Sequence, residues 1–322
     1  MFEIDAVDKR IKRKLSIGEF AALIFVFSLA VYLTLTHTGY FWDYKNILAS
    51  AKGDTGLYFY GYWLLPLFYL FSTLPFEAGY LIWASLGILG VWFAARVFNG
   101  RSVLTLISYQ LSYALFWGQI SGILCGVLAL FWWAMHRRKW ELAGFALLIA
   151  AAKPQTGGMF AFLLWVFADI SWREKLRICI IPAAGVLLTF VFYPGWISNI
   201  LSRIGNAIAW GNISLWQWIG PWALLFFLPA LIIPMGRQRR FLALASAGIL
   251  AVPYFLQTDL LTLFIFPIGI LPVLLGYLPG IMLQFFSFAG QPSGVIVPLS
   301  VYLWQTIPGL AAWFKKKRLS QT

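Results

Sequence analysis

The sequence has little charge and few of the residues that bind metals. Only 11% of its 322 residues are charged, and it has two cysteines and two histidines. Cys125 and Cys179 both lie in apolar runs that we expect at different membrane depths, which disfavours a disulfide or a thiolate metal site. His37 and His136 have no partners at the spacing of metal ligands. We therefore expect no metal site and no cofactor.

The scarcity of acidic residues leaves a net charge of +13, which could suggest a nucleic-acid binder. A binder of that kind would carry its basic residues as a stripe on a soluble face, whereas here they come in short bursts between apolar runs. The chain is 61% hydrophobic and 19% aromatic, well above the apolar share of about 45–50% in soluble domains. We expect an all-α polytopic membrane protein that forms one integral membrane domain over residues 1–322, contacts lipids and binds no nucleic acid.

The basic bursts predict the membrane topology. Of the 24 lysines and arginines, 20 fall into six clusters, and the other four are Lys45, Lys52, Lys153 and Arg203. By the positive-inside rule the clusters are cytoplasmic, so each gap between them crosses the membrane an even number of times. The clusters lie at 9–14, 96–101, 137–139, 173–177, 237–240 and 315–318.

The first part of the chain can be assigned from this parity. Residues 1–16 form a basic cytoplasmic N-terminus, and the apolar run 17–36 is too long for a signal peptide and reads as a retained first span. An outer segment, 37–78, precedes a second span near 79–97. The aromatic stretch 58–75 is apolar, but a crossing there would put every later basic cluster outside, so we expect interfacial helices instead.

Two helical hairpins follow, at 102–135 and 139–172. They turn outside near Gln119 and Lys153, and their helices are shorter than the roughly 20 residues of a typical span. Short helices imply a thinned bilayer or a cavity that opens at the outer surface.

The C-terminal half is less clearly resolved by the sequence. Its tail has to end inside and crosses either once or three times, so both ten and twelve spans remain open. The expected elements are a span near 178–194, an outer tryptophan-rich loop at 195–218, spans near 219–235 and 241–257, and a basic cytoplasmic tail at 315–322.

Four of the 11 acidic residues are predicted outside: Asp43, Asp54, Glu77 and Asp259. An ionisable group beside the apolar core is costly unless it serves a site or a water-filled cavity. Asp54 lies in a Gly-rich turn pattern, and Glu77 fits the start of a helix. Asp259 fits either a helix cap or a functional group. Asp43 lies among aromatic residues directly after a span and is the hardest to explain as structure alone.

Three other polar residues share the predicted outer side. Lys153 and Arg203 could bind an anion, although Lys153 could equally extend toward lipid headgroups. Gln119 could hold a ligand or satisfy backbone groups at a helix start. The sequence Asn212-Ile-Ser214 fits a glycosylation acceptor. The many tryptophans are more often interfacial anchors than platforms for sugars.

Several segments together resemble a known family. They are "FWDY" around Asp43, then "LYFYGYWLLPLFYLFSTLP", then "FWGQISGILCGVLALFWWAMHRRKWELAGFALLIAAAKPQ", and more loosely "YFLQTDLLTLFIFP" around Asp259. In this order they resemble the GT-C class of membrane glycosyltransferases, and most closely glycosyltransferase family 87, the polyprenyl-phosphate-mannose-dependent mannosyltransferases.

The resemblance implies a GT-C-like bundle of about 10–12 transmembrane helices with interfacial helices on the outer face. It also implies an active site on that face, with Asp43 as the general base and a polyprenyl-phosphate sugar as the donor, such as a mannose donor. The acceptor would be a hydroxyl of a glycan or lipid. The predicted substrate-binding residues are Trp42, Tyr44, Gln119, Lys153, Gln155, Arg203, Gln257 and Asp259.

The expected location is the bacterial plasma membrane, with both termini in the cytoplasm. Two alternatives remain beside the enzyme. The chain is shorter than expected in its C-terminal half, so it could be an inactive GT-C-like scaffold bound to other membrane subunits. It could also be a transporter or flippase for lipid-linked sugars, although the predicted charges gather at the two surfaces rather than at the midplane.

Overall fold

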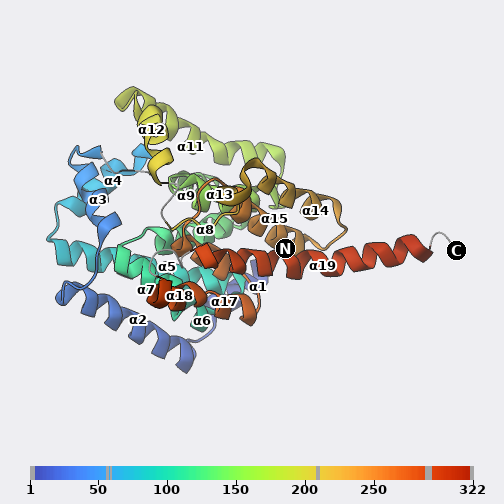
Figure 1. The fold of residues 1–322 in the computed structure, drawn as a ribbon. Coiled ribbons are helices and arrows are strands. Elements are labelled where there is room, and N and C mark those ends of the chain that lie inside the picture. The colour runs from blue at the N-terminus through green and yellow to red at the C-terminus, as the bar shows by residue number, and fades with distance from the viewer. Residues whose placement is uncertain (1–3, 56–57, 59, 208–210, 287–291, 320–322) are drawn as a thin grey trace. The chain divides into compact units, whose positions relative to one another are not determined.

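A computed structural model of the chain describes residues 4–55, 58, 60–207, 211–286 and 292–319. Every regular element in these ranges is a helix, apart from one isolated antiparallel bridge between Asn212 and Leu256. Figure 1 shows the helices in chain order. The predicted all-α membrane fold is confirmed. By its internal contacts the chain separates into two compact units.

The first unit contains most of the chain up to Ala207 together with Thr258–Pro267. The short turns that form the candidate site lie in this unit. Its α-helices are α1 Ile4–Lys12, α2 Ile17–Leu35, α3 Trp42–Ala51, α4 Leu65–Ser72, α5 Phe76–Phe98, α6 Ser102–Leu106, α7 Tyr109–Trp117, α8 Ser121–His136, α9 Trp140–Ala151, α10 Met159–Val166, α11 Trp172–Phe192, α12 Trp196–Ala207 and α16 Leu261–Phe264.

The second unit contains Ile208–Gln257 and Ile268–Thr322. Helix α15 packs against α19, and the hydroxyl of Tyr302 on α19 donates to the carbonyl of Phe226 at 2.8 Å. The helices of this unit are α13 Trp216–Ile219, α14 Phe227–Ile232, α15 Arg237–Ala251, α17 Ile270–Leu275, α18 Leu278–Phe286 and α19 Ile296–Leu319.

Four helical stretches are long and apolar enough to cross a membrane. They are Ile17–Leu35, Phe76–Phe98, Trp172–Phe192 and Pro292–Ala311, and Ser102–Trp117 with Ser121–His136 adds a fifth if this pair, bent by 114°, is one span. These numbers cover only the described residues. Several further apolar helices are shorter than a typical span. The total of ten or twelve crossings therefore stays a prediction.

Two of the expected spans differ from the structure. Residues 219–235 contain a 3₁₀ helix, Gly220–Phe226, and the short helix α14, instead of one continuous α-helix. The span expected at 241–257 begins earlier and ends at Ala251. Val252 is extended there because the ring of Pro253 disfavours helical backbone in the residue before it.

The glycosylation motif at Asn212 lies in a buried turn of the second unit. Asn212 is 1% exposed, and its amide donates to the carbonyl of Pro253 at 2.8 Å. Its side-chain oxygen accepts from the backbone amides of Ser214 and Phe255. A buried amide with these partners is not available for glycosylation, so the acceptor interpretation was wrong.

Helices α5 and α8 form the central contact of the first unit. A Cβ added at Gly126 would lie 2.7 Å from the Cα of Gly90, and one added at Gly90 would lie 2.7 Å from the carbonyl oxygen of Gly122. Small residues allow two backbones to approach this closely, which is a common way to join helices in a membrane.

One end of this helix pair is tied to the basic N-terminal segment. Buried Arg96 on α5 donates to Glu19 of α2 at 2.9 Å and to the backbone carbonyls of Arg13 and Lys14. Arg137 at the end of α8 pairs with Asp8 of α1. Residues from three of the basic clusters thus meet at one end of the unit, which agrees with their predicted placement on one side of the membrane.

Replacing Gly126 with alanine should destabilise the first unit. The new methyl group would meet backbone atoms of Gly90, and overpacking of this kind costs about 1–3 kcal/mol. Thermal unfolding of the purified chain in detergent measures the change. Gly236→Ala is the matched control, because a Cβ there meets open space. Equal melting temperatures for the two variants would contradict the close α5–α8 contact.

Candidate functional site

The sharp turn before α3 fixes the position of Asp43. Phe41, the residue before the helix, has a left-handed backbone with φ of 52°. A bulky residue in this conformation is strained by about 1–3 kcal/mol, and the surrounding structure has to hold it. Its backbone amide donates to the carbonyl of Phe116 at the end of α7 at 2.9 Å, and its buried ring packs against Tyr80. The strained turn thereby places Asp43 beside the α7–α8 turn.

Glycine is required in that second turn. Gly118 has φ of 72°, and a Cβ there would lie 2.7 Å from the Cβ of Tyr44. Its carbonyl accepts from the indole nitrogen of Trp83 at 3.2 Å. The close approach of the two backbones brings Gln119, the next residue, against the first turn of α3.

Lys153 leaves the end of α9 because Pro154 follows it. A residue before proline is pushed toward extended backbone, and Lys153 has φ of −121° and ψ of 84°. The carbonyl of Ala152 accepts from the amide of Gly61 at 2.8 Å. This bond holds the aromatic segment near Lys153, and the lysine Nζ lies 5.9 Å from the centre of the Tyr60 ring.

Asp259 lies on a 3₁₀ turn, Gln257–Leu260, that leads into α16. Its carboxylate oxygen Oδ1 accepts from the hydroxyl of Ser121, at the start of α8, and from Nζ of Lys153, both at 2.6 Å. Thr262 donates to its backbone carbonyl at 2.6 Å. The second carboxylate oxygen, Oδ2, is buried and has no hydrogen-bond partner among the described residues.

These side chains form one continuous chain of hydrogen bonds. The amide nitrogen of Gln119 donates to Oδ2 of Asp43, and the amide oxygen accepts from Nζ of Lys153 at 3.2 Å. Lys153 then reaches Asp259. The four polar residues that the sequence singled out from separate segments are therefore brought together. We name Asp43, Gln119, Lys153 and Asp259 the outer cluster, after the side of the membrane on which the sequence predicts them.

The outer cluster is almost fully closed to solvent. Asp43 is 8% exposed, Lys153 3% and Asp259 0%, while Gln119 is half-buried. Burial raises the pKa of Asp43 to about 7; Lys153 and the Gln119 bond lower it, and the Asp259 charge raises it further. A carboxylate whose pKa lies near neutral pH can exchange a proton during a reaction.

The other predicted site residues lie elsewhere or have other surroundings. Tyr44 is fully buried against Tyr80 and Trp83, which favours a packing role. Trp42 and Gln155 are half-buried and are not part of the hydrogen-bonded cluster. Their predicted roles in substrate binding stay untested.

Two of the predictions cannot be placed at the cluster. Arg203 lies in α12, and its side chain is outside the described part of the structure. Gln257 is buried and belongs to the second unit, so it is not assigned to the cluster.

Sequence reasoning missed Ser121 and Tyr60. Ser121 follows Gln119 by two residues in the same short motif, so the "GQIS" stretch carried the signal. Tyr60 is one of several tyrosines in an aromatic segment, and nothing in the sequence distinguishes it from its neighbours. No group of three or more His, Cys, Asp or Glu side chains is placed to hold a metal within the described ranges.

This geometry defines the class of the protein. It is an all-α membrane protein that has a buried cluster of carboxylate and ammonium groups at the turns between its helices. The sequence model of glycosyltransferase family 87 matches residues 58–275, more than half of the chain. The chain belongs to glycosyltransferase family 87, and it is a membrane glycosyltransferase. The match includes Gln119, Lys153 and Asp259, whereas Asp43 precedes it. No match was found among curated proteins or among solved structures.

Removing the ammonium group should destabilise the first unit. Lys153→Met leaves the carboxylate of Asp259 buried without its cation, and breaking a buried pair costs about 3–5 kcal/mol. Thermal unfolding measures this loss. Lys153→Met combined with Asp259→Leu should recover most of the stability, because no charge of the pair is left alone. Lys45→Met, at an exposed lysine, is the control, and a similar loss there would contradict the assignment.

Proposed function

We propose that this glycosyltransferase moves a hexose from a polyprenyl-phosphate donor to an acceptor hydroxyl, with Asp43 as the general base. The observation that carries the proposal is the hydrogen-bonded outer cluster, in which a buried carboxylate, an amide and an ammonium group are joined to one another. A mannose donor rests on the family resemblance alone.

The reaction needs one base and one site for the leaving group. The acceptor oxygen attacks the anomeric carbon while its proton passes to Asp43, and the bond from that carbon to the phosphate oxygen breaks. Polyprenyl phosphate leaves with the bonding electron pair. A single direct displacement inverts the anomeric centre, and no covalent intermediate on the protein is required.

Asp43 is better suited than Asp259 to act as the general base. Its described hydrogen-bond partner is the neutral amide of Gln119, whereas Asp259 is paired directly with the ammonium of Lys153. Two carboxylates in one cluster with different surroundings commonly divide their roles in this way. Asp43 is also the more exposed of the two.

Lys153 is suited to the leaving phosphate. An ammonium group has three N–H donors, and two of them are used, by Asp259 and Gln119. The third can donate to a phosphate oxygen, and a charge-assisted hydrogen bond of this kind strengthens as negative charge develops. The lipid tail of the donor would lie along the apolar faces of the neighbouring helices, which present many exposed hydrophobic side chains.

Asp43→Asn should abolish sugar transfer. The change keeps the shape of the side chain but removes the proton acceptor, and loss of a general base lowers the rate by about 10²–10⁴-fold. Transfer from a synthetic polyprenyl-phosphate mannose is measured with purified protein in nanodiscs. Glu77→Gln, at an exposed carboxylate outside the cluster, should retain activity. An active Asp43→Asn variant would overturn the proposal and favour the scaffold or transport alternatives.

The reaction should also depend on pH in a defined direction. Asp43 acts as a base only when it is unprotonated, and its pKa is about 7, so kcat/KM should fall about tenfold per pH unit below that value and level off above it. Gln119→Leu removes a hydrogen bond that lowers this pKa, so the inflection should move to higher pH. A profile that is flat between pH 5 and pH 8, or an inflection that moves down, would contradict this role.

A further inference from the structure

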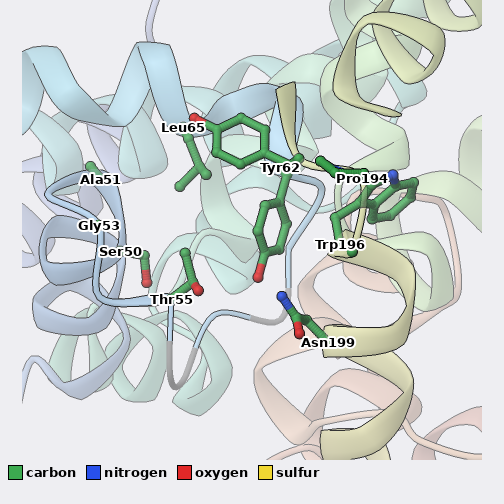
Figure 2. A pocket seen from close by; sticks show the side chains of 11 residues that line it. Ser50, Ala51, Gly53, Thr55, Tyr62, Leu65, Pro194, Trp196 and Asn199 are labelled. Carbon is green, nitrogen blue, oxygen red and sulfur yellow. The ribbon is translucent and has the colours of Figure 1, made fainter. Parts of the chain in front are cut away.

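A second polar feature of the first unit lies away from the outer cluster. A cavity of about 280 Å³ lies at the C-terminal end of α3, between the 3₁₀ turn Tyr62–Leu64 and the turn from α11 to α12. Figure 2 shows its lining side chains. The polar and aromatic ones are Ser50, Thr55, Tyr62, Tyr193, Trp196 and Asn199.

The described lining of this cavity is neutral. Among the described residues, none that lines it is charged, so these side chains offer no counter-charge to a phosphate. Aromatic rings form much of its wall: the ring of Tyr62 lies 5.5 Å from that of Tyr193 and 6.4 Å from that of Trp196. Aromatic faces combined with a few hydroxyl and amide groups suit a neutral sugar ring, whose C–H faces pack on the aromatics while its hydroxyls form hydrogen bonds.

Two residues that line the cavity have a polar group without a hydrogen-bond partner in the described part of the chain: Tyr62 through its hydroxyl and Trp196 through its indole nitrogen. The hydroxyl of Tyr62 is buried and has no hydrogen-bond partner among the described residues, and the whole residue is 2% exposed. The hydroxyl has almost no surface open to the cavity, so a ligand would reach it only after a small shift of the ring, and satisfying a costly unpartnered donor would then favour binding.

Helix α3 connects the cavity with the proposed base. Asp43 and Ser50 are seven residues apart and both buried, so they lie on the same face of the helix, about 10 Å apart along its axis at 1.5 Å per residue. On the neighbouring segment, Tyr60 lies over Lys153 and Tyr62 lines the cavity. This separation is longer than one sugar ring.

We propose that this cavity is an acceptor subsite that binds a neutral sugar ring of an oligosaccharide or glycolipid, at least one residue away from the hydroxyl that is glycosylated. The inference rests on the proposed function and specifies its acceptor. The cavity is close to the lower end of the range of about 300–1,000 Å³ for small-molecule pockets, so it accommodates one ring and not the polyprenyl chain. An acceptor with several sugars would bind more tightly than a single sugar.

The test measures binding and does not depend on catalysis. The purified full chain in nanodiscs is titrated by calorimetry with neutral trisaccharides of mannose, glucose or galactose and with the corresponding monosaccharides. At least one trisaccharide should bind, more tightly than its monosaccharide. Tyr62→Phe, which removes only the unpartnered hydroxyl, and Asn199→Leu should each weaken that binding about three- to tenfold.

Two matched variants separate this inference from the proposed function. Tyr69→Phe removes a hydroxyl from an exposed tyrosine on the adjacent helix α4 and should leave binding unchanged. Asp43→Asn should also retain trisaccharide binding, even though it loses transfer. If no trisaccharide binds, or if both Tyr62→Phe and Asn199→Leu bind as well as the parent chain, the subsite is refuted whether or not Asp43 is the base.

Discussion

The side-chain amide of Gln119 is the contact on which the rest of the candidate site depends. Its nitrogen donates to Asp43 and its oxygen accepts from Lys153, so one neutral group joins a carboxylate at the start of α3 to an ammonium at the end of α9. An amide can serve both partners because it is a donor at one end and an acceptor at the other. Left-handed backbone at Phe41 and at Gly118 brings these segments together. Glycine adopts this conformation readily, whereas at Phe41 it is strained.

The outer cluster also explains why so apolar a chain keeps buried charges. A lone ammonium or carboxylate in this buried position would be strongly disfavoured, but Lys153 and Asp259 compensate each other and Ser121 donates a second hydrogen bond to Asp259. Burial raises the pKa of Asp43 to about 7, although the charge of Lys153 lowers it. The structure thus contains an ion pair and, beside it, a carboxylate whose pKa lies near neutral pH.

The sequence predicted the members of this cluster better than it predicted the helices. Asp43, Gln119, Lys153 and Asp259 stood out because polar groups are rare beside long apolar runs, and each follows or precedes a helix break. Ser121 and Tyr60 were missed because a serine or tyrosine is unremarkable in such segments and only three-dimensional contacts identify it. The span expected at 241–257 was placed too late, since the hydropathy of the run outweighed the effect of Pro253 on Val252.

The two ends of α5 relate the cluster to the membrane. Near its start, Trp83 donates to the carbonyl of Gly118, beside Gln119, and at its other end Arg96 binds the basic N-terminal segment. Trp83 and Arg96 lie 13 residues apart on this helix, about 20 Å at 1.5 Å per residue, which is about two thirds of a hydrocarbon core of about 30 Å. If the basic residues around Arg96 face the cytoplasm, the cluster faces the opposite side, where cytosolic nucleotide sugars do not reach. The proposed donor, carried to that side by its polyprenyl lipid, would meet this constraint, and its tail would lie along the apolar helices beside the cluster.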